Sequence, residues 1–297
     1  MNTKNIKKHL NAKLKYWMES ITDEEVKKIV KGNTIITGGA MVSLLTGEPV
    51  NDYDVYFRTF EACQRVAQYY VDLWNKTHPE NKQAELRIED NRVKVFISSL
   101  GVVEEKSEDN PFPPIDESIE PTDEDKAPNQ EDAQSDEKPK YRPVFMTSNA
   151  ITLSDKIQVV IRFYGEVEDI HKNYDFAHCT CSWTSWDNEV QLPTKALECI
   201  INKELYYVGS KYPLCSIIRT RKYLERGYHI NAGQYVKMAF QLNSLNLNDI
   251  KTLEDQLVGV DSGFFMMLIA ALQEKQEKDG SDQVDTAYVI ELINRMF

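Results

Sequence analysis

The sequence contains no long hydrophobic segment. Its 297 residues are 41% hydrophobic, but no apolar run approaches the ~20 residues of a membrane-spanning helix. Residues 1–10 are basic and polar and contain no signal-peptide core. We therefore expect a cytoplasmic protein with no membrane partner.

Cysteine is scarce, and the five cysteines form an odd, scattered set, namely Cys63, Cys179, Cys181, Cys199 and Cys215. This set fits a reducing compartment better than a disulfide framework. His178, which precedes Cys179 and Cys181, suggests a metal ligand, but a zinc site needs about four ligands. Cysteines that alternate along a strand are more often small buried hydrophobic residues.

A global excess of basic charge is also absent, since the net charge is −12. The acidic excess is local, because residues 104–138 contain 14 acidic groups and 3 lysines. The other 262 residues carry 33 acidic and 32 basic groups, which is compatible with a basic face. The surrounding stretch 103–142 is too polar to offset its ordering entropy, so we expect a disordered acidic insertion. An alternative is a nucleic-acid mimic that competes for the protein's own basic groove.

The remaining pattern predicts an α+β fold, with a mixed sheet and flanking helices over residues 1–190 and an all-helical domain over residues 191–297. The helices expected in the first part are 5–18, 22–32 (with a capping box at its start) and 60–74. The strands expected there are 92–98, 144–146, 151–153, 156–163 and 174–183. The helices expected afterwards are 194–205, 213–226, 232–245, 248–257, 264–275 and 287–297.

A glycine pair marks the most informative window of the chain. Gly38 and Gly39 follow a short apolar run and precede an apolar helical stretch over residues 40–45. A helix that opens at such a pair has unpaired backbone N–H groups, which favour an anion such as phosphate.

Two aspartates follow the glycine pair at one-residue spacing. Alternate side chains of a strand share one face, so Asp52 and Asp54 point one way while Tyr53 and Val55 point the other way. Close carboxylates repel each other and attract a divalent cation. Together with an anion-binding turn, this pattern predicts a site for a nucleoside triphosphate with Mg²⁺.

These motifs resemble those of the nucleotidyltransferase superfamily, which includes DNA polymerase β, poly(A) polymerases and CCA-adding tRNA enzymes. Residues 38–43 read G-G-A-M-V-S, and residues 47–54 read G-E-P-V-N-D-Y-D. The bacterial poly(A) polymerase and CCA-adding branch is similar, with a strand, G-G-A-V-R-D, a helix and then D-x-D. Weaker similarities are N-Y-D-F-A-H-C at 173–179, for the family's R-R-D-F-T-x-N, and a Pro-Leu at 213–214 with basic residues after it.

The departures from the family pattern concern specificity. Val42 and Ser43 stand where the family has R-D, and the R-R pair before the strand aspartate is replaced by Asn173 and Tyr174. Cys179 replaces the strand asparagine. These replacements argue against CCA-type specificity but leave the metal site intact. An E-D-N-R string at 89–92 is similar to the family's base-reading motif, and we interpret it as coincidence because it precedes a strand.

The resemblance implies in-line attack on the α-phosphate of an NTP, with two Mg²⁺ ions as cofactors. It implies that Asp52 and Asp54 are metal ligands and that Asp175, on a later strand, is a third acidic group: a ligand, a base or a ribose contact. The nucleotide-binding residues that it implies are Gly38, Gly39, Ala40, Arg219 and Lys222.

The leading hypothesis is therefore an Mg²⁺-dependent nucleotidyltransferase that acts on an RNA 3′ end, a protein hydroxyl or a small molecule. An alternative is a catalytically degenerate fold that serves as a structural or binding module, for example in a phage assembly. A third hypothesis is a toxin–antitoxin transferase with a tRNA or protein acceptor. The acidic insert and short layout suit a phage or mobile element, and the sequence does not specify the NTP, the acceptor or the oligomeric state.

Overall fold

The computed structural model describes residues 2–89, 91–97, 140–257, 263–279 and 285–296, which form two compact units. Unit 1 contains the described residues up to 97 together with 140–172 and 178–200, and unit 2 contains residues 173–177 and those from 201 onward. Most of the predicted acidic insertion, 103–139, lies outside the described residues. At its end Tyr141 is described and is buried.

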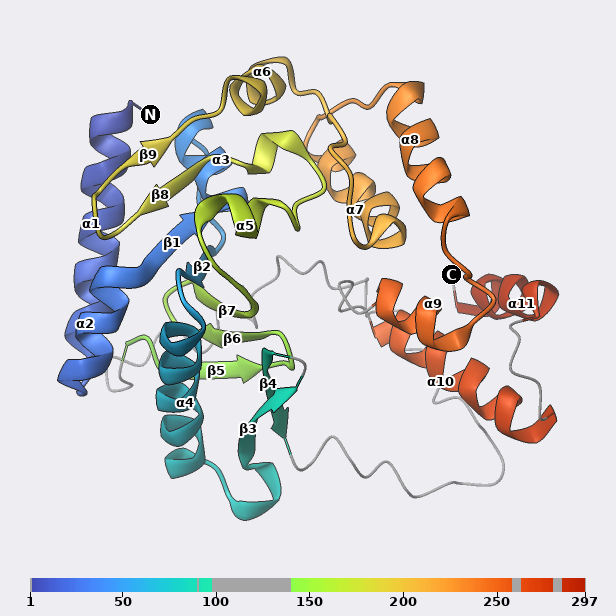
Figure 1. The fold of residues 1–297 in the computed structure, drawn as a ribbon, viewed down its shortest axis with the longest axis horizontal. Helices are drawn as coiled ribbons and strands as arrows, with labels where there is room; N and C mark the ends of the chain where they lie inside the picture. Colours follow the sequence, from blue (N-terminus) through green and yellow to red (C-terminus); the bar gives the residue numbers. More distant parts are fainter. Residues whose placement is uncertain (1, 90, 98–139, 258–262, 280–284, 297) are drawn as a thin grey trace. The chain divides into compact units, whose positions relative to one another are not determined.

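Unit 1 is built on a seven-stranded mixed sheet with the order β5-β6-β7-β2-β1-β8-β9 (Figure 1). Its strands are β1 (Thr34–Thr37), β2 (Tyr53–Phe57), β5 (Pro143–Met146), β6 (Ala150–Leu153), β7 (Ile157–Tyr164), β8 (Ser182–Thr184) and β9 (Val190–Gln191). Strands β2 and β7 are parallel, and the other neighbouring pairs are antiparallel. The expected mixed sheet is therefore present.

Helices flank this sheet and supply most of its core (Figure 1). They are α1 (Thr3–Ser20), α2 (Glu24–Asn33), α3 (Gly39–Thr46), α4 (Phe60–Thr77), α5 (Val167–His171) and α6 (Thr194–Asn202), which ends at the start of unit 2. Buried residues of α1, α2, α3 and α4 form one cluster with Ile36, Val55 and Val159 of the sheet. Within this cluster Trp17 donates a 2.6 Å hydrogen bond to the hydroxyl of Tyr70. The apolar spacing predicted these helices because it reflects the face that each one buries.

Helix α2 begins one residue later than the predicted capping box. Its N-cap is Asp23, whose carboxylate accepts hydrogen bonds from the N–H groups of Glu25 (2.9 Å) and Val26 (3.1 Å). The expected cap at Thr22 is wrong, because the N–H of Thr22 instead donates to the hydroxyl of Tyr69 at 3.1 Å. A carboxylate also interacts favourably with the positive end of the helix.

A β-hairpin packs against α4, and the sequence analysis predicted its second strand but not its first. It consists of β3 (Ala84–Glu89) and β4 (Arg92–Ile97), with Asn91 in the left-handed region at φ 59°. Glu89 and Arg92, the first and last residues of the E-D-N-R string, are register partners in this hairpin.

The strand predicted over residues 174–183 is wrong. Phe176 forms only an isolated bridge to Tyr207, residues Ala177–Cys179 form the 3-10 turn η4, and regular pairing begins at β8. Asp175 therefore lies on an irregular segment of unit 2 and on no strand of the sheet.

Unit 2 is otherwise helical, as predicted. Its helices are α7 (Pro213–Glu225), α8 (Ala232–Asn243), α9 (Ile250–Leu257), α10 (Gly263–Asp279) and α11 (Thr286–Met296). A small buried cluster joins α7 and α8 to the segment before them and contains Phe176, Leu205, Tyr207, Tyr228 and Met238. Across the part of the chain that the structure describes, no helix is both long and apolar enough to span a membrane.

Candidate nucleotide-binding site

The register of β1 and β2 brings the glycine pair to the acidic pair. The two strands are antiparallel, and Ile36 lies opposite Val55. One step further along the same register, Thr37 at the end of β1 comes level with Asp54, and Gly38 follows directly. The turn and the carboxylates therefore lie at one end of the sheet, within unit 1.

The acidic pair faces away from the flanking helices. Tyr53 is buried on the helix side, where its hydroxyl lies 2.6 Å from His9 Nε2 and its ring centroid lies 5.2 Å from the ammonium of Lys13. Because side chains alternate along a strand, Asp54 and the preceding Asp52 lie on the opposite face, where both are half-buried.

The glycine turn opens helix α3. Gly38 has φ +76° and ψ −143°, a conformation that favours glycine, and its N–H donates to the carbonyl of Cys179 at 3.2 Å. Gly39 is the first helical residue, and a Cβ placed on it would meet no atom within 4 Å. The N–H groups of Gly39 and Ala40 fall in the first turn, where a helix offers no internal acceptor. An anion can approach these groups through the open space beside Gly39.

Hydrogen bonds to Thr37 fix the end of β1. The hydroxyl of Thr37 is buried, lies 2.8 Å from His171 Nε2 and donates to the carbonyl of Cys181 at 2.9 Å. Burial lowers the pKa of His171 to about 4, so this imidazole is neutral at pH 7. A neutral ring at this place supports the turn without adding charge to the site.

Two polar residues that the sequence analysis missed share the open face with the aspartates. Gln158 on β7 is the register partner of Asp54, and Thr152 on β6 is the partner of Gln158. Both are half-buried. The signal for them was the alternation over residues 157–163, which buries Ile157 and Val159 and leaves Gln158 on the other side.

The other predicted site residues belong to unit 2. Asp175 is buried, and its Oδ2 forms an ion pair with Arg219 Nη1 at 3.1 Å, with side-chain exposures of 7% and 32%. Lys222 follows one turn later on α7 and is half-buried. The structure thus joins Asp175 to Arg219 in unit 2, whereas Asp52, Asp54 and the glycine pair meet in unit 1.

The carboxylate pair offers a small set of hard oxygen ligands. Among the residues that the structure describes, no group of three or more His, Cys, Asp or Glu side chains is placed to hold a metal ion. Mg²⁺ commonly binds through one or two carboxylates and completes its shell with substrate phosphates and water. The donor set of Asp52 and Asp54 fits an Mg²⁺ ion that arrives with a nucleotide.

Cys181 has no property of a reactive or metal-binding thiol. Burial raises its pKa to about 12, so the thiol stays protonated at neutral pH. Cys179 and His178 beside it are buried, with 3.3 Å between Sγ and Nε2. The interpretation of these cysteines as buried hydrophobic residues agrees with this environment.

Comparison with known proteins finds a curated relative and similar solved structures. The relative, "Gabija anti-defense 2" of Bacillus phage SPbetaL7, is 19% identical over 240 residues, which are 80% of this chain and 44% of that protein. A Thermotoga maritima CCA-adding enzyme complexed with tRNA is 10% identical at a TM-score of 0.39, covering 95% of this chain and 53% of that one. A Bacillus stearothermophilus CCA-adding enzyme in complex with CTP is 12% identical at a TM-score of 0.34, covering 80% and 47%.

The chain thus spans about half the length of these proteins or less. A family model described as Gabija anti-defense 2 family protein matches residues 8–203, a range that contains the whole sheet of unit 1. Since this match covers more than half of the chain, the protein belongs to the Gabija anti-defense 2 family.

Proposed function

We propose that the protein is an Mg²⁺-dependent nucleotidyltransferase that moves a nucleoside monophosphate from an NTP to an acceptor. The observation that carries this proposal is the β1–β2 register, which sets the anion-binding turn at Gly38 beside Asp52 and Asp54 on the open face of the sheet. A nucleoside triphosphate with its cation needs both features at once.

In this reaction an acceptor hydroxyl attacks the α-phosphorus, the bond between the α-phosphorus and the bridging oxygen breaks, and pyrophosphate leaves. Asp52 and Asp54 hold the cations, and the N–H groups of Gly39 and Ala40 bind the β- and γ-phosphates. When bound, two Mg²⁺ ions lower the pKa of the attacking hydroxyl and stabilise the charge on the leaving pyrophosphate.

For unit 2 we propose a supporting role. Arg219 and Lys222 of unit 2 are suited to contact an anionic group of a substrate, since a guanidinium recognises phosphate oxygens well. The buried ion pair with Arg219 makes Asp175 better suited to orient that guanidinium than to bind a cation. The sequence resemblance favours the poly(A) polymerase and CCA-adding branch, with an RNA 3′ end or a protein hydroxyl as acceptor. Because the family is described as Gabija anti-defense, we propose that the acceptor is a component of Gabija defence.

Labelling tests the proposal. The full chain is incubated with each α-labelled NTP, Mg²⁺ or Mn²⁺, and a lysate or total RNA from cells that carry the Gabija defence. We expect one NTP to label one macromolecule, and Asp52→Asn with Asp54→Asn to abolish the label. Asp72→Asn, which changes an exposed carboxylate on α4, is the matched control and keeps it. Equal labelling by the double variant and the wild type would disprove the proposal.

A second candidate function is a binding module without catalysis. The observation that favours it is that no third acidic group joins Asp52 and Asp54 among the residues that the structure describes, and that the register partner of Asp54 is the amide Gln158. A module of this kind would counter Gabija defence by binding a component of it. In cells that carry the defence, Asp52→Asn with Asp54→Asn would then still protect an infecting phage. Loss of protection and of labelling together would support the enzyme.

A further inference from the structure

The turn between β6 and β7 has an unusual backbone. Residues 154–156 connect the two strands, and Asp155 and Lys156 both adopt left-handed conformations, with φ of 60° and 62°. This region is disfavoured for residues that carry a Cβ, and glycine normally occupies at least one such position in a tight turn. Neither residue of this pair is glycine.

The same turn brackets Asp52 from two sides. The ammonium of Lys156 donates to the carbonyl of Val50 at 2.8 Å, and the carbonyl of Lys156 accepts from the N–H of Tyr53 at 2.8 Å. Asp52 lies between these two anchors and just before the first residue of β2. An exposed lysine side chain loses rotamer freedom when it is fixed in this way, so the contact has an entropic cost.

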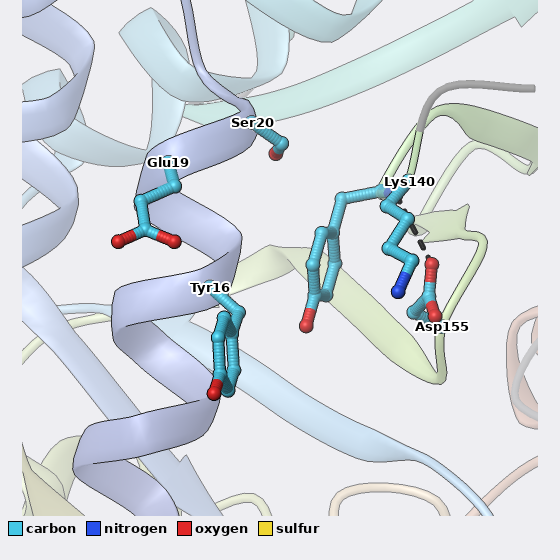
Figure 2. Close-up of a pocket in the computed structure, with 6 residues that line it drawn as sticks. Tyr16, Glu19, Ser20, Lys140 and Asp155 are labelled. Carbon is cyan, nitrogen blue, oxygen red and sulfur yellow. Dashed lines mark hydrogen bonds between the residues drawn. The ribbon is translucent and has the colours of Figure 1, made fainter.

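The turn is also held from behind. The N–H of Tyr141 donates to Asp155 Oδ2 at 3.4 Å, and Lys13 donates to the carbonyl of Asp155. Tyr141 itself has φ +56° and lies with its ring centroid 4.9 Å from the Lys13 ammonium. Figure 2 shows Asp155 and Lys140 across a hollow of about 450 Å³ from Tyr16 of α1. The contacts of Asp155 with Tyr141 and Lys13 hold the turn, from which the side chain of Lys156 reaches the carbonyl of Val50.

A turn that only closed the β6–β7 hairpin would not need the Lys156 ammonium. Glycine would relieve the left-handed conformation at position 156, and the backbone carbonyl alone would still accept from the N–H of Tyr53. The side-chain bond to Val50 adds nothing to the hairpin. It acts only on the segment that leads into the acidic pair.

We propose that Lys156 is a positioning residue that holds residues 50–53 and thereby keeps Asp52 beside Asp54. Its consequence for cation binding rests on the proposed function. The order that it imposes on residues 50–53 does not depend on any ligand.

The test compares Lys156→Met with the wild type in the full chain. This variant keeps the aliphatic stem and the backbone bond to Tyr53 but loses the ammonium. Without nucleotide, hydrogen–deuterium exchange in peptides that cover residues 50–53 should become roughly threefold to tenfold faster, as expected for one lost hydrogen bond. Lys140→Met, an exposed lysine that borders the hollow near the turn, is the matched control and should leave that exchange unchanged.

A second arm follows the consequence for the site. The Mg²⁺ concentration that gives half-maximal thermal stabilisation by the NTP should rise by roughly threefold to tenfold in Lys156→Met. Lys156→Gly should give the same two results with an unchanged or higher melting temperature, because glycine tolerates this φ. Wild-type exchange rates in Lys156→Met would overturn the positioning role. If the wild type itself shows no response to NTP with Mg²⁺, the proposed function fails, while the exchange measurement still decides the role of Lys156.

Discussion

Gly38 and Gly39 are adjacent, yet the structure requires glycine at only one of them. At Gly38 the combination of φ +76° and ψ −143° is strained for every residue with a Cβ. Gly39 has a helical backbone and open space beside its Cα. Substitution of Gly38 therefore tests the stability of the turn, and substitution of Gly39 tests its use as a binding surface.

Alanine substitutions at the two positions should affect different properties, namely stability at Gly38 and NTP affinity at Gly39. Gly38→Ala should destabilise the protein by about 1–3 kcal/mol and lower its melting temperature by several degrees. Gly39→Ala should leave the melting temperature within about 2 °C, because its backbone is helical and an added Cβ meets open space. If phosphate binds there, the new methyl group occupies its approach, and NTP affinity measured by calorimetry should fall. Undiminished affinity in Gly39→Ala would move the phosphate site elsewhere.

His171 should make stability depend on pH. Burial lowers its folded-state pKa to about 4 from 6.5, so between these values the unfolded chain binds a proton that the folded chain does not. The free energy of unfolding therefore rises with pH from 4 to 6.5, and the destabilising contribution, on the order of 1–3 kcal/mol, is fully present below pH 4. His171→Gln should flatten the rise in denaturant titrations. His229→Gln, an exposed histidine of unit 2, should not.

At the level of single residues, the sequence predicted what local spacing determines. Asp52 and Asp54 share a face because a strand alternates, and that follows from two positions alone. The partner of Asp175 could not be predicted in this way, since Arg219 is 44 positions away and comes close only when α7 packs. Gln158 could not be predicted as a site residue, because no sequence motif distinguishes an amide on a strand.

Helix α7 carries two arginines whose ion pairs differ in burial. Arg219→Leu should destabilise unit 2 by about 1–3 kcal/mol, because the carboxylate of Asp175 stays buried after its partner is lost, and the partial exposure of Arg219 reduces the effect. Arg221→Leu, two residues further along the same helix, removes a pair with Glu225 whose side chains are 71% and 52% exposed. It should change stability by less than about 0.5 kcal/mol.

Thermal unfolding of the full chain measures both variants. Adding Asp175→Asn to Arg219→Leu should recover part of the loss, because the buried charge is then gone. Equal melting temperatures for Arg219→Leu and Arg221→Leu would show that the Asp175 pair adds no stability.

Elements with a strong apolar stripe were predicted, and those without one were missed or misplaced. Helices α1 and α4 bury four and seven residues at helical spacing, which is a signal carried by their own sequence. Strand β3 has one buried residue, Ala84, and its remaining positions pair with β4 and are largely open to water. The segment 174–183 alternates in sequence, but Phe176 bridges to Tyr207 of unit 2, and the segment joins the sheet only from Ser182 onward.

At the scale of the whole molecule, nearly all of the net negative charge lies in one acidic stretch between two strands of unit 1. Residues 104–138 carry 14 acidic groups and 3 lysines, while β4 before it and β5 after it both belong to unit 1. Replacing residues 103–138 with a Gly/Ser linker should bring the net charge close to zero and leave the melting temperature within about 2 °C. A clear fall in melting temperature would mean that the stretch packs on the fold and is not the disordered insertion that its composition predicts.

The parallel pairing of β2 with β7 has a consequence for biosynthesis. Asp54 and its register partner Gln158 are about a hundred positions apart in the chain, so a nascent polypeptide must emerge beyond β7 before the acidic strand gains its second neighbour. Pairing over such separations is slow, because a long loop must close first. On a ribosome stalled before residue 157, β2 would lack its pairing with β7, and one edge of the strand would have no hydrogen-bond partner. The sheet around Asp54 can therefore be completed only after β7 has left the ribosome.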